Sequence, residues 1–173
     1  MYLNPIEFKN LLLKASKEEK EVVIICIGSD KYIFDSFGPV LGQLIKEKRL
    51  LNIKVYGTLD NPIHALNLQK EFEIIRNKHK NSFIIGVDAS VTTKNISERI
   101  AFLNKSIEPG LAFNKKLIPV GDCSIIFRVS KEEASEIKEM RISEVYNECK
   151  KIVDFLDCID DEITYDSADI IVF

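Results

Sequence analysis

The stretch "EVVIICIG", residues 21–28, decides the fold class. It is a continuous apolar run, rich in β-branched side chains, and it ends at Gly28. Such a run is typical of a strand that is buried on both faces. Strands of this kind form parallel sheets with helices covering both sides. We therefore expect an α/β fold, and we look for helices on either side of this strand.

Helical and strand patterns alternate around that stretch. Asn4 and Pro5 open an amphipathic helix, and a second helix is predicted over residues 36–48. A short strand is predicted at residues 52–58 and a third, buried strand at residues 81–90, stopping at Asp88. The Asn61-Pro62 opening predicts a further helix between them. This alternation predicts a three-layer α/β/α sandwich with a mainly parallel sheet.

The second half of the chain has a less regular pattern. Residues 99–119 read as strand-like pieces separated by Pro109-Gly110, either a hairpin or an irregular excursion. Residues 122–130 predict another strand, and residues 131–157 are helical in pattern. Residues 162–173 end in an apolar, strand-like run without an assigned place. With no linker or repeat in 173 residues, we expect one domain over residues 1–173.

Composition excludes several classes of protein. The net charge is −3 and no basic cluster is visible, which disfavours nucleic-acid binding. The longest apolar run is too short to cross a membrane, and the N-terminus lacks a secretory pattern, so we expect a cytoplasmic protein. The four cysteines form no CxxC pair, which disfavours a disulfide framework or a zinc ribbon. Cys26 and Cys123 lie in apolar runs and are predicted to be buried thiols.

In a parallel sheet, sites form at the carboxyl ends of the strands. The loops at residues 28–35, 58–64 and 88–93 should meet there. They carry the candidate side chains Asp30, Asp35, Asp60, His64 and Asp88. No GxGxxG, GxxxxGK[ST] or GxSxG motif is present, so nucleotide binding and a serine hydrolase lose their usual support.

The sequence allows two roles for each of Asp35 and Asp88. Asp35 precedes a predicted helix, so it either caps that helix or serves as a base, and the two roles are compatible. Asp88 ends a buried strand, either as an ordinary loop start or as a member of a site. Two acids at neighbouring strand ends would share a proton and activate a water molecule. A carboxylate dyad is the leading chemical hypothesis.

The remaining polar candidates are less specific. His64, predicted one turn into its helix, is either structural or, with Asp35 and Asp88, one ligand of a divalent metal. His79 lies between lysines and is expected on the surface. Asp60 by default caps the helix at Asn61-Pro62. Asp122 is either a turn residue at a strand start or a wall of the cleft.

Five stretches together resemble a known family. In order along the chain they read "CIGSDKYIFDSFGP", "VYGTLDNPIHALNL", "IIGVDAS", "EPGLAFNKKLIPVGDCSI" and "RISEVYNECKKI". They resemble the YyaC-like sporulation proteins, which are relatives of the germination (spore) protease. The resemblance covers roughly residues 22–156. It implies the phosphorylase/hydrolase-like α/β/α sandwich that hydrogenase maturation endopeptidases also use.

The resemblance also implies roles for individual residues. Asp35 in "FDSFGP" and Asp88 in "VDAS" match the catalytic pair proposed for the germination protease. In the hydrogenase endopeptidases, acids at these two positions bind nickel with a histidine, but no histidine follows Asp88 here. Tyr32, Ile33 and Phe34 replace small or polar residues of the family, which narrows or covers the expected cleft.

The resulting hypothesis is a sporulation-associated peptidase in which Asp35 and Asp88 form an acid/base pair. The implied partner is a protein or peptide substrate, with small acid-soluble spore proteins suggested by the resemblance and a forespore or spore location to match. No cofactor is required, although a divalent metal is possible. A homo-oligomer remains open. Two alternatives are a non-catalytic peptide-binding module on the same scaffold and a metal-dependent hydrolase using Asp35, Asp88 and His64.

Overall fold

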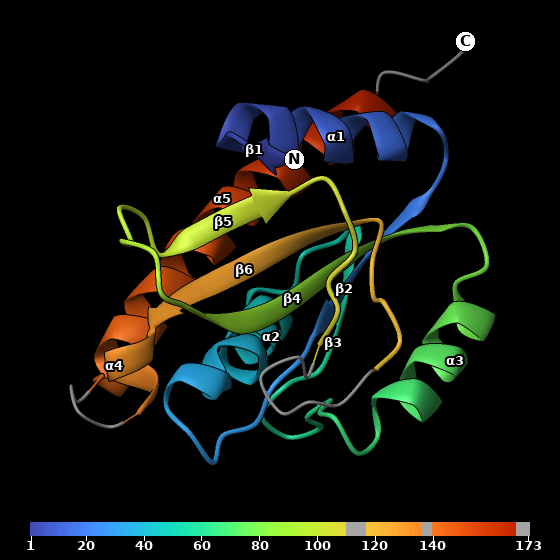
Figure 1. Cartoon of the computed structure of the whole chain (residues 1–173). Coiled ribbons are helices and arrows are strands. Elements are labelled where there is room, and N and C mark those ends of the chain that lie inside the picture. The colour runs from blue at the N-terminus through green and yellow to red at the C-terminus, as the bar shows by residue number, and fades with distance from the viewer. Residues whose placement is uncertain (110–116, 136–139, 169–173) are drawn as a thin grey trace, which may run out of the picture.

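A six-stranded sheet forms the centre of the protein (Figure 1). The computed structural model describes residues 1–109, 117–135 and 140–168. The strand order is β1-β5-β6-β4-β2-β3. The four strands β6, β4, β2 and β3 run parallel to one another. Strand β5 runs antiparallel to β6, and β1 runs antiparallel to β5. The strands are β1 (Tyr2–Leu3), β2 (Glu21–Cys26), β3 (Ile53–Tyr56), β4 (Ser82–Thr92), β5 (Ile100–Leu103) and β6 (Cys123–Ser130).

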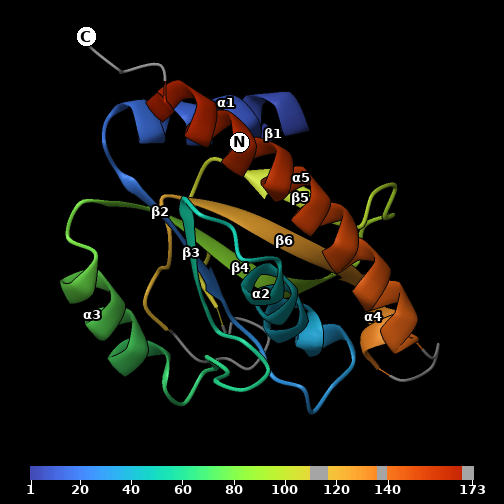
Figure 2. The same cartoon turned by 180° about the vertical axis from the view of Figure 1, so that it is seen from behind.

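Helices cover both faces of this sheet, which confirms the predicted α/β/α layers. The helices are α1 (Pro5–Lys17), the 3₁₀ helix η1 (Phe34–Ser36), α2 (Phe37–Lys48), α3 (Leu68–Lys78), α4 (Lys131–Ala134) and α5 (Ile142–Ala168). Figures 1 and 2 show α1, α2 and α5 on one face and α3 on the other. Asn4 caps α1 in a capping box with Glu7, as the Asn-Pro opening predicts.

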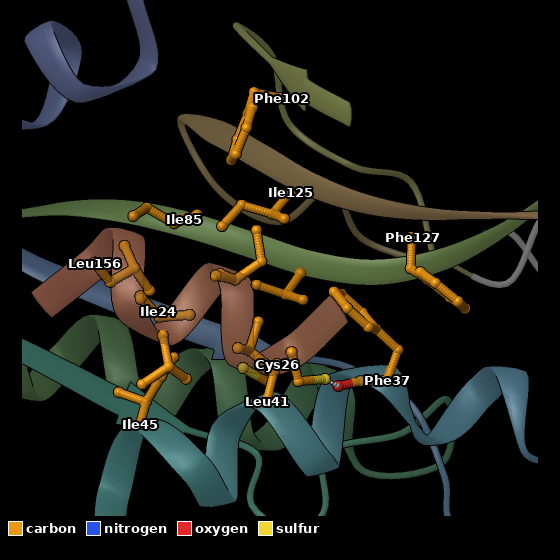
Figure 3. Packing of buried hydrophobic residues seen from close by; sticks show 14 of the residues in the cluster. Ile24, Cys26, Phe37, Leu41, Ile45, Ile85, Phe102, Ile125, Phe127 and Leu156 are labelled. Carbon is orange, nitrogen blue, oxygen red and sulfur yellow. Dashed lines mark hydrogen bonds between the residues drawn. The ribbon is translucent and has the colours of Figure 1, made fainter. Parts of the chain in front are cut away.

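Strand β2 is buried on both faces, as its continuous apolar sequence predicts. Ile24 and Cys26 pack into the larger core cluster, toward α1, α2 and α5. Val23 and Ile25 point the other way, into the cluster under α3. Figure 3 shows the larger cluster, in which Phe37 of α2 meets Phe127 of β6. Their rings are stacked with centroids 4.8 Å apart, so the first turn of α2 is fixed against the sheet.

Two element boundaries differ from the predictions. The helix expected from Asn61 begins only at Leu68, because Ile63 forms a parallel bridge with Ile27 and is held at the sheet edge. Strand β4 does not stop at Asp88 but continues to Thr92, because β6 supplies pairing partners as far as Ser130. Tertiary pairing overrides the local sequence signal in both places.

The C-terminal half is partly described. Residues 162–168 continue α5, and the apolar, strand-like run at residues 169–173 lies outside the described part of the chain. Ile107 and Val120 form an antiparallel bridge on either side of the segment that was expected to be a hairpin or irregular. Within this segment, residues 110–116 lie outside the described part of the chain. Within the described ranges, no helix combines the length and the apolar character that crossing a bilayer requires.

His79 is buried, so the expectation of a surface histidine is wrong. Only 7% of its surface is exposed. Its ring nitrogens lie 2.7 Å from the hydroxyl of Tyr56 and 2.9 Å from a carboxylate oxygen of Glu21. The flanking lysines suggested that the side chain is exposed to solvent. His79 is instead the C-cap residue of α3, and its ring contacts Glu21 of β2 and Tyr56 of β3. Its partners come from distant parts of the chain, which the local sequence does not reveal.

Candidate functional site

The carboxyl end of β2 brings three segments of the chain together. On one side, the Ile27 amide donates to the carbonyl of Val87, so β4 runs alongside and places Asp88 just beyond the last paired residue of β2. On the other side, the Gly28 amide donates to the carbonyl of Ile63 at 2.9 Å. The segments that carry Asp88 and His64 therefore flank the start of the loop that leads to Asp35.

The loop at residues 28–35 folds back on itself. The Ser29 amide donates to the backbone carbonyl of Asp35 at 3.1 Å, which closes the loop. Gly28 has φ +146°, and a Cβ atom there would lie 2.1 Å from the Asp35 carbonyl oxygen. A Cβ atom on Gly38 would lie 2.1 Å from the carbonyl oxygen of Ile27. Both glycines are therefore needed for η1 and α2 to approach the end of β2 this closely.

Asp35 lies in η1, and its side chain does not cap α2. The N-cap residue of α2 is Ser36, whose side chain makes no capping bond and donates instead to the carbonyl of Ile33 at 2.6 Å. Burial raises the pKa of Asp35, while a hydrogen bond from the Ser29 backbone and the charge of His64 oppose the rise. Asp35 therefore does not occupy the N-cap position of α2.

Asp88 is a partly buried carboxyl in the second half of β4, opposite Ile126 of β6. Burial and, to a smaller extent, the negative charge of Asp35 together raise its pKa to about 8. The amide of Ala89, which donates to Oδ1 at 2.8 Å, opposes the rise only in part. Because this pKa lies above neutrality, Asp88 is protonated at pH 7.

His64 lies in a loop and not within a helix as its sequence suggests. Its amide donates to Asn67 at 2.8 Å, and its Nδ1 accepts the amide of Leu66 at 3.3 Å. Its charge lowers the pKa of Asp35, so the two side chains interact electrostatically. Across the described ranges, however, no three His, Cys, Asp or Glu side chains are grouped as a metal site needs. The arrangement therefore does not support the set Asp35, Asp88 and His64 as metal ligands.

The other three acidic candidates lie in different places. Asp30 is exposed and borders an apolar groove beside α2. Asp60 pairs with Lys46 at 3.1 Å and lines the same pocket as His64. Asp122 accepts the amide of Ile84 at 2.8 Å and so lies at the amino edge of the sheet, opposite the site. Asp122 precedes a parallel strand, and for that reason it is not a wall of the cleft.

Sequence reasoning missed the contribution of α5. Ile142 and Tyr146, from its first two turns, border the same groove as Asp30 and Ile33. No signal in the sequence links a late helix to this early loop, although the two side chains do interrupt an otherwise polar helix face. Tyr32 and Phe34 stack with centroids 6.2 Å apart, and Tyr32 remains 54% exposed.

The cysteines do not supply a nucleophile at this site. Cys26, Cys123 and Cys149 are buried free thiols, as predicted for the first two, and Cys149 contacts the carbonyl of Phe37. Burial raises the pKa of each of the three thiols, which keeps them protonated. The groups available for chemistry are therefore two carboxyls. Asp88 is protonated at neutral pH, and the negative charge of Asp35 contributes to its raised pKa.

Comparisons with known proteins agree with this picture at the level of fold and family. The sequence profile of the family described as "Protein of unknown function (DUF1256)" matches residues 3–155. The uncharacterized protein YyaC of Bacillus subtilis (strain 168) is 37% identical over 106 residues, which span 61% of this chain and only 52% of that protein. The chain thus matches about half the length of this relative.

The fold is also found in a solved structure. The [NiFe] hydrogenase maturation protease HycI from Thermococcus kodakarensis KOD1 superposes with a TM-score of 0.52. The superposition covers 84% of this chain and 98% of that one, at 16% sequence identity. At this identity the similarity establishes a shared α/β architecture and not a shared reaction.

Proposed function

The chain belongs to the DUF1256 family, and we propose that it is a peptidase in which Asp35 and Asp88 act as an acid/base pair. One observation carries the proposal: the pKa of Asp88 rises to about 8, in part because of the charge on Asp35. Burial raises the pKa of both carboxyls, and the charge of Asp35 adds to the rise at Asp88; such a perturbed pair is typical of a catalytic dyad.

In the proposed hydrolysis of a peptide bond, one carboxyl acts as the general base and the other as a hydrogen-bond donor. Asp35, as the ionised member, takes a proton from a water molecule, which then attacks the carbonyl carbon of the scissile bond. Asp88, as the protonated member, donates a hydrogen bond to the carbonyl oxygen and stabilises the negative charge that develops there. The tetrahedral intermediate breaks down when Asp35 passes the proton that it took from water to the leaving nitrogen; the C–N bond then breaks, the carbonyl re-forms and the amine departs.

Two resemblances support the class of reaction and suggest the biological setting. A protease shares the α/β architecture, and the motifs around Asp35 and Asp88 resemble those of the germination protease. On that basis we place the protein in sporulation, in the cytoplasm of the forespore or spore. Small acid-soluble spore proteins are the proposed substrates.

The test is cleavage of purified small acid-soluble spore proteins by the wild-type protein and by Asp35→Asn and Asp88→Asn. Each substitution should remove nearly all activity, because proton sharing needs both carboxyls. The rate of the wild-type protein should fall above about pH 8, where Asp88 loses its proton. An Asp88→Asn protein that cleaves as fast as wild type would contradict the mechanism.

A second candidate function is peptide binding without cleavage on the same scaffold. The apolar groove that runs from Ile33 to Tyr146 favours it, because binding there needs neither carboxyl. In that case the wild-type protein would bind spore proteins without cutting them, and Asp35→Asn would bind as well as wild type. Replacing Tyr32, Ile33 and Phe34 by Ser, Thr and Gly tests whether these side chains block cleavage.

A further inference from the structure

An apolar groove of about 590 Å³ lies beside the loop that carries Asp35. Helix α2 buries Phe37, Leu41 and Ile45 in the core and presents a second stripe at helical spacing to the groove. The groove is lined by residues of the 28–36 loop, α2, the loop after β3 and the start of α5. Its apolar lining residues include Ile33, Leu44, Leu59, Ile142 and Tyr146.

The apolar lining is unusually open to solvent. Ile33, Leu59, Ile142 and Tyr146 are between 42% and 53% exposed, although they come from three separate segments of the chain. Single exposed apolar residues are common and need no explanation. Four that gather around one concavity are typical of a surface that contacts another molecule.

The charged groups of the groove are all acidic. Asp30 and Glu47 are the charged residues that line it, and among the described lining residues none is basic. Glu47 accepts the side-chain amide of Gln43 at 3.0 Å. The other end of that amide, Gln43 Oε1, is buried and has no hydrogen-bond partner in the described part of the chain. The accessible charges of the lining are therefore those of Asp30 and Glu47, which favour a cationic ligand.

We infer that this groove binds a segment of the protein substrate that joins an apolar side chain to a neighbouring lysine or arginine. The inference rests on the proposed peptidase function, since it makes the groove the part of the substrate site next to Asp35. The apolar side chain packs against Leu44 and Tyr146. The cation faces Asp30 and Glu47.

Position along the chain connects the groove to the dyad. Ile33 and Ser36 line the groove, and Asp35 lies between them in η1. A substrate segment held in the groove is therefore anchored within a few residues of the proposed base. Such an anchor holds the scissile bond in place and favours substrates by sequence, which the dyad alone does not do.

The test uses three short peptides: acetyl-Gly-Leu-Lys-Leu-Gly-amide, its Leu-Glu-Leu twin and its Ser-Lys-Ser twin. Binding is followed by amide chemical shifts of the full ¹⁵N-labelled chain carrying Asp35→Asn, so that cleavage does not interfere. We expect the Leu-Lys-Leu peptide to shift the amides of Ile33, Leu44 and Tyr146. It should bind at least about five-fold more tightly than either twin. Equal affinities for the lysine and glutamate peptides, or shifts confined to other surfaces, would overturn the inference.

Substitutions of groove residues test which side chains produce the preference for the Leu-Lys-Leu peptide. Tyr146→Ala should weaken the Leu-Lys-Leu peptide at least about five-fold, and Asp30→Asn with Glu47→Gln should erase its advantage over the glutamate twin. Leu66→Ala is the matched control, because Leu66 is 84% exposed and lies outside the groove. A dimer in solution that Tyr146→Ala dissociates would overturn the inference, since a second copy would then fill the groove.

The same variants separate this inference from the proposed function. If spore proteins are cleaved and Tyr146→Ala leaves KM unchanged, the groove inference fails and the peptidase stands. If the Leu-Lys-Leu peptide binds in the groove but no substrate is cleaved, the peptidase fails and the groove remains a binding site. A rise in KM without a fall in kcat in Tyr146→Ala supports both.

Discussion

The negative charge of Asp35 raises the pKa of Asp88, although the two residues lie on different elements and far apart in the sequence. Strand β4 continues past the end of β2 and holds Asp88 in place, while Ser29 and the two glycines return the loop from β2 to the same edge. Because burial adds to this repulsion, Asp88 keeps its proton at neutral pH.

The free energy of unfolding should depend on pH through Asp88. Unfolding returns its pKa from about 8 to the ordinary value of 3.8. Between about pH 4 and about pH 8 the folded protein therefore binds one proton more, and each pH unit of increase removes about 1.4 kcal/mol of stability. Above about pH 8 both states have lost the proton and the effect is complete.

Urea unfolding at about pH 5 and about pH 8 checks this expectation. Asp88→Asn should remove most of the pH dependence and should be more stable than wild type at the higher pH. The exposed Asp30→Asn should keep the wild-type dependence. If wild type and Asp88→Asn lose stability in parallel as pH rises, Asp88 does not hold a proton in the folded state.

Most of the fold was readable from the sequence because each buried strand carries its own signal. "EVVIICIG" and "FIIGV" are continuous and apolar, so burial on both faces and a parallel sheet follow from them. The start of α3 was not readable, because the bridge from Ile63 to Ile27 outweighs the Asn61-Pro62 signal. The burial of His79 likewise depends on Tyr56 and Glu21, which no local pattern connects to it.

The sequence predicts which side chains lie at the candidate site, but not the pKa of Asp88 or the contribution of α5 to the groove. Asp35, Asp88 and His64 follow from the rule that parallel strands end at one edge. The same rule excludes Asp122, which precedes its strand. The pKa of Asp88 was not readable, because it depends on how deeply the carboxyl is buried and on the charge beside it. The contribution of α5 to the groove depends on tertiary packing alone.

Divalent metals should not stabilise the protein through His64. The described residues bring no three ligand side chains together, so Zn²⁺ or Ni²⁺ has no preformed site at this edge. We expect Tm to respond equally in wild type and in His64→Ala when either metal is added. A rise in Tm that His64→Ala abolishes would restore the metal-dependent hydrolase.

Tyr56→Phe should destabilise the protein by about 1–3 kcal/mol, because it leaves a nitrogen of the buried His79 ring without its partner. Urea unfolding measures the loss. Tyr146→Phe is the control, since its ring is 45% exposed and the hydroxyl can bond to water. Equal stability of the two variants would mean that the bond between Tyr56 and His79 contributes nothing.

Gly38→Ala should disturb the site through the backbone. A Cβ atom there would lie 2.1 Å from the carbonyl oxygen of Ile27, so α2 must move away from the end of β2. We expect a loss of about 1–3 kcal/mol in the free energy of unfolding. A pKa of Asp88 closer to its ordinary value should accompany it, as Asp35 moves away. A fully stable Gly38→Ala protein would show that this close approach is not required.

The most direct test of the coupled pair is a ¹³C NMR titration of the Asp88 carboxyl in the wild-type protein and in Asp35→Asn. We expect a pKa of about 8 for Asp88 in the wild-type protein. We expect a lower value in Asp35→Asn, because the neighbouring negative charge is gone. An Asp88 pKa near 3.8, or a raised value that Asp35→Asn leaves unchanged, would contradict the acid/base pair.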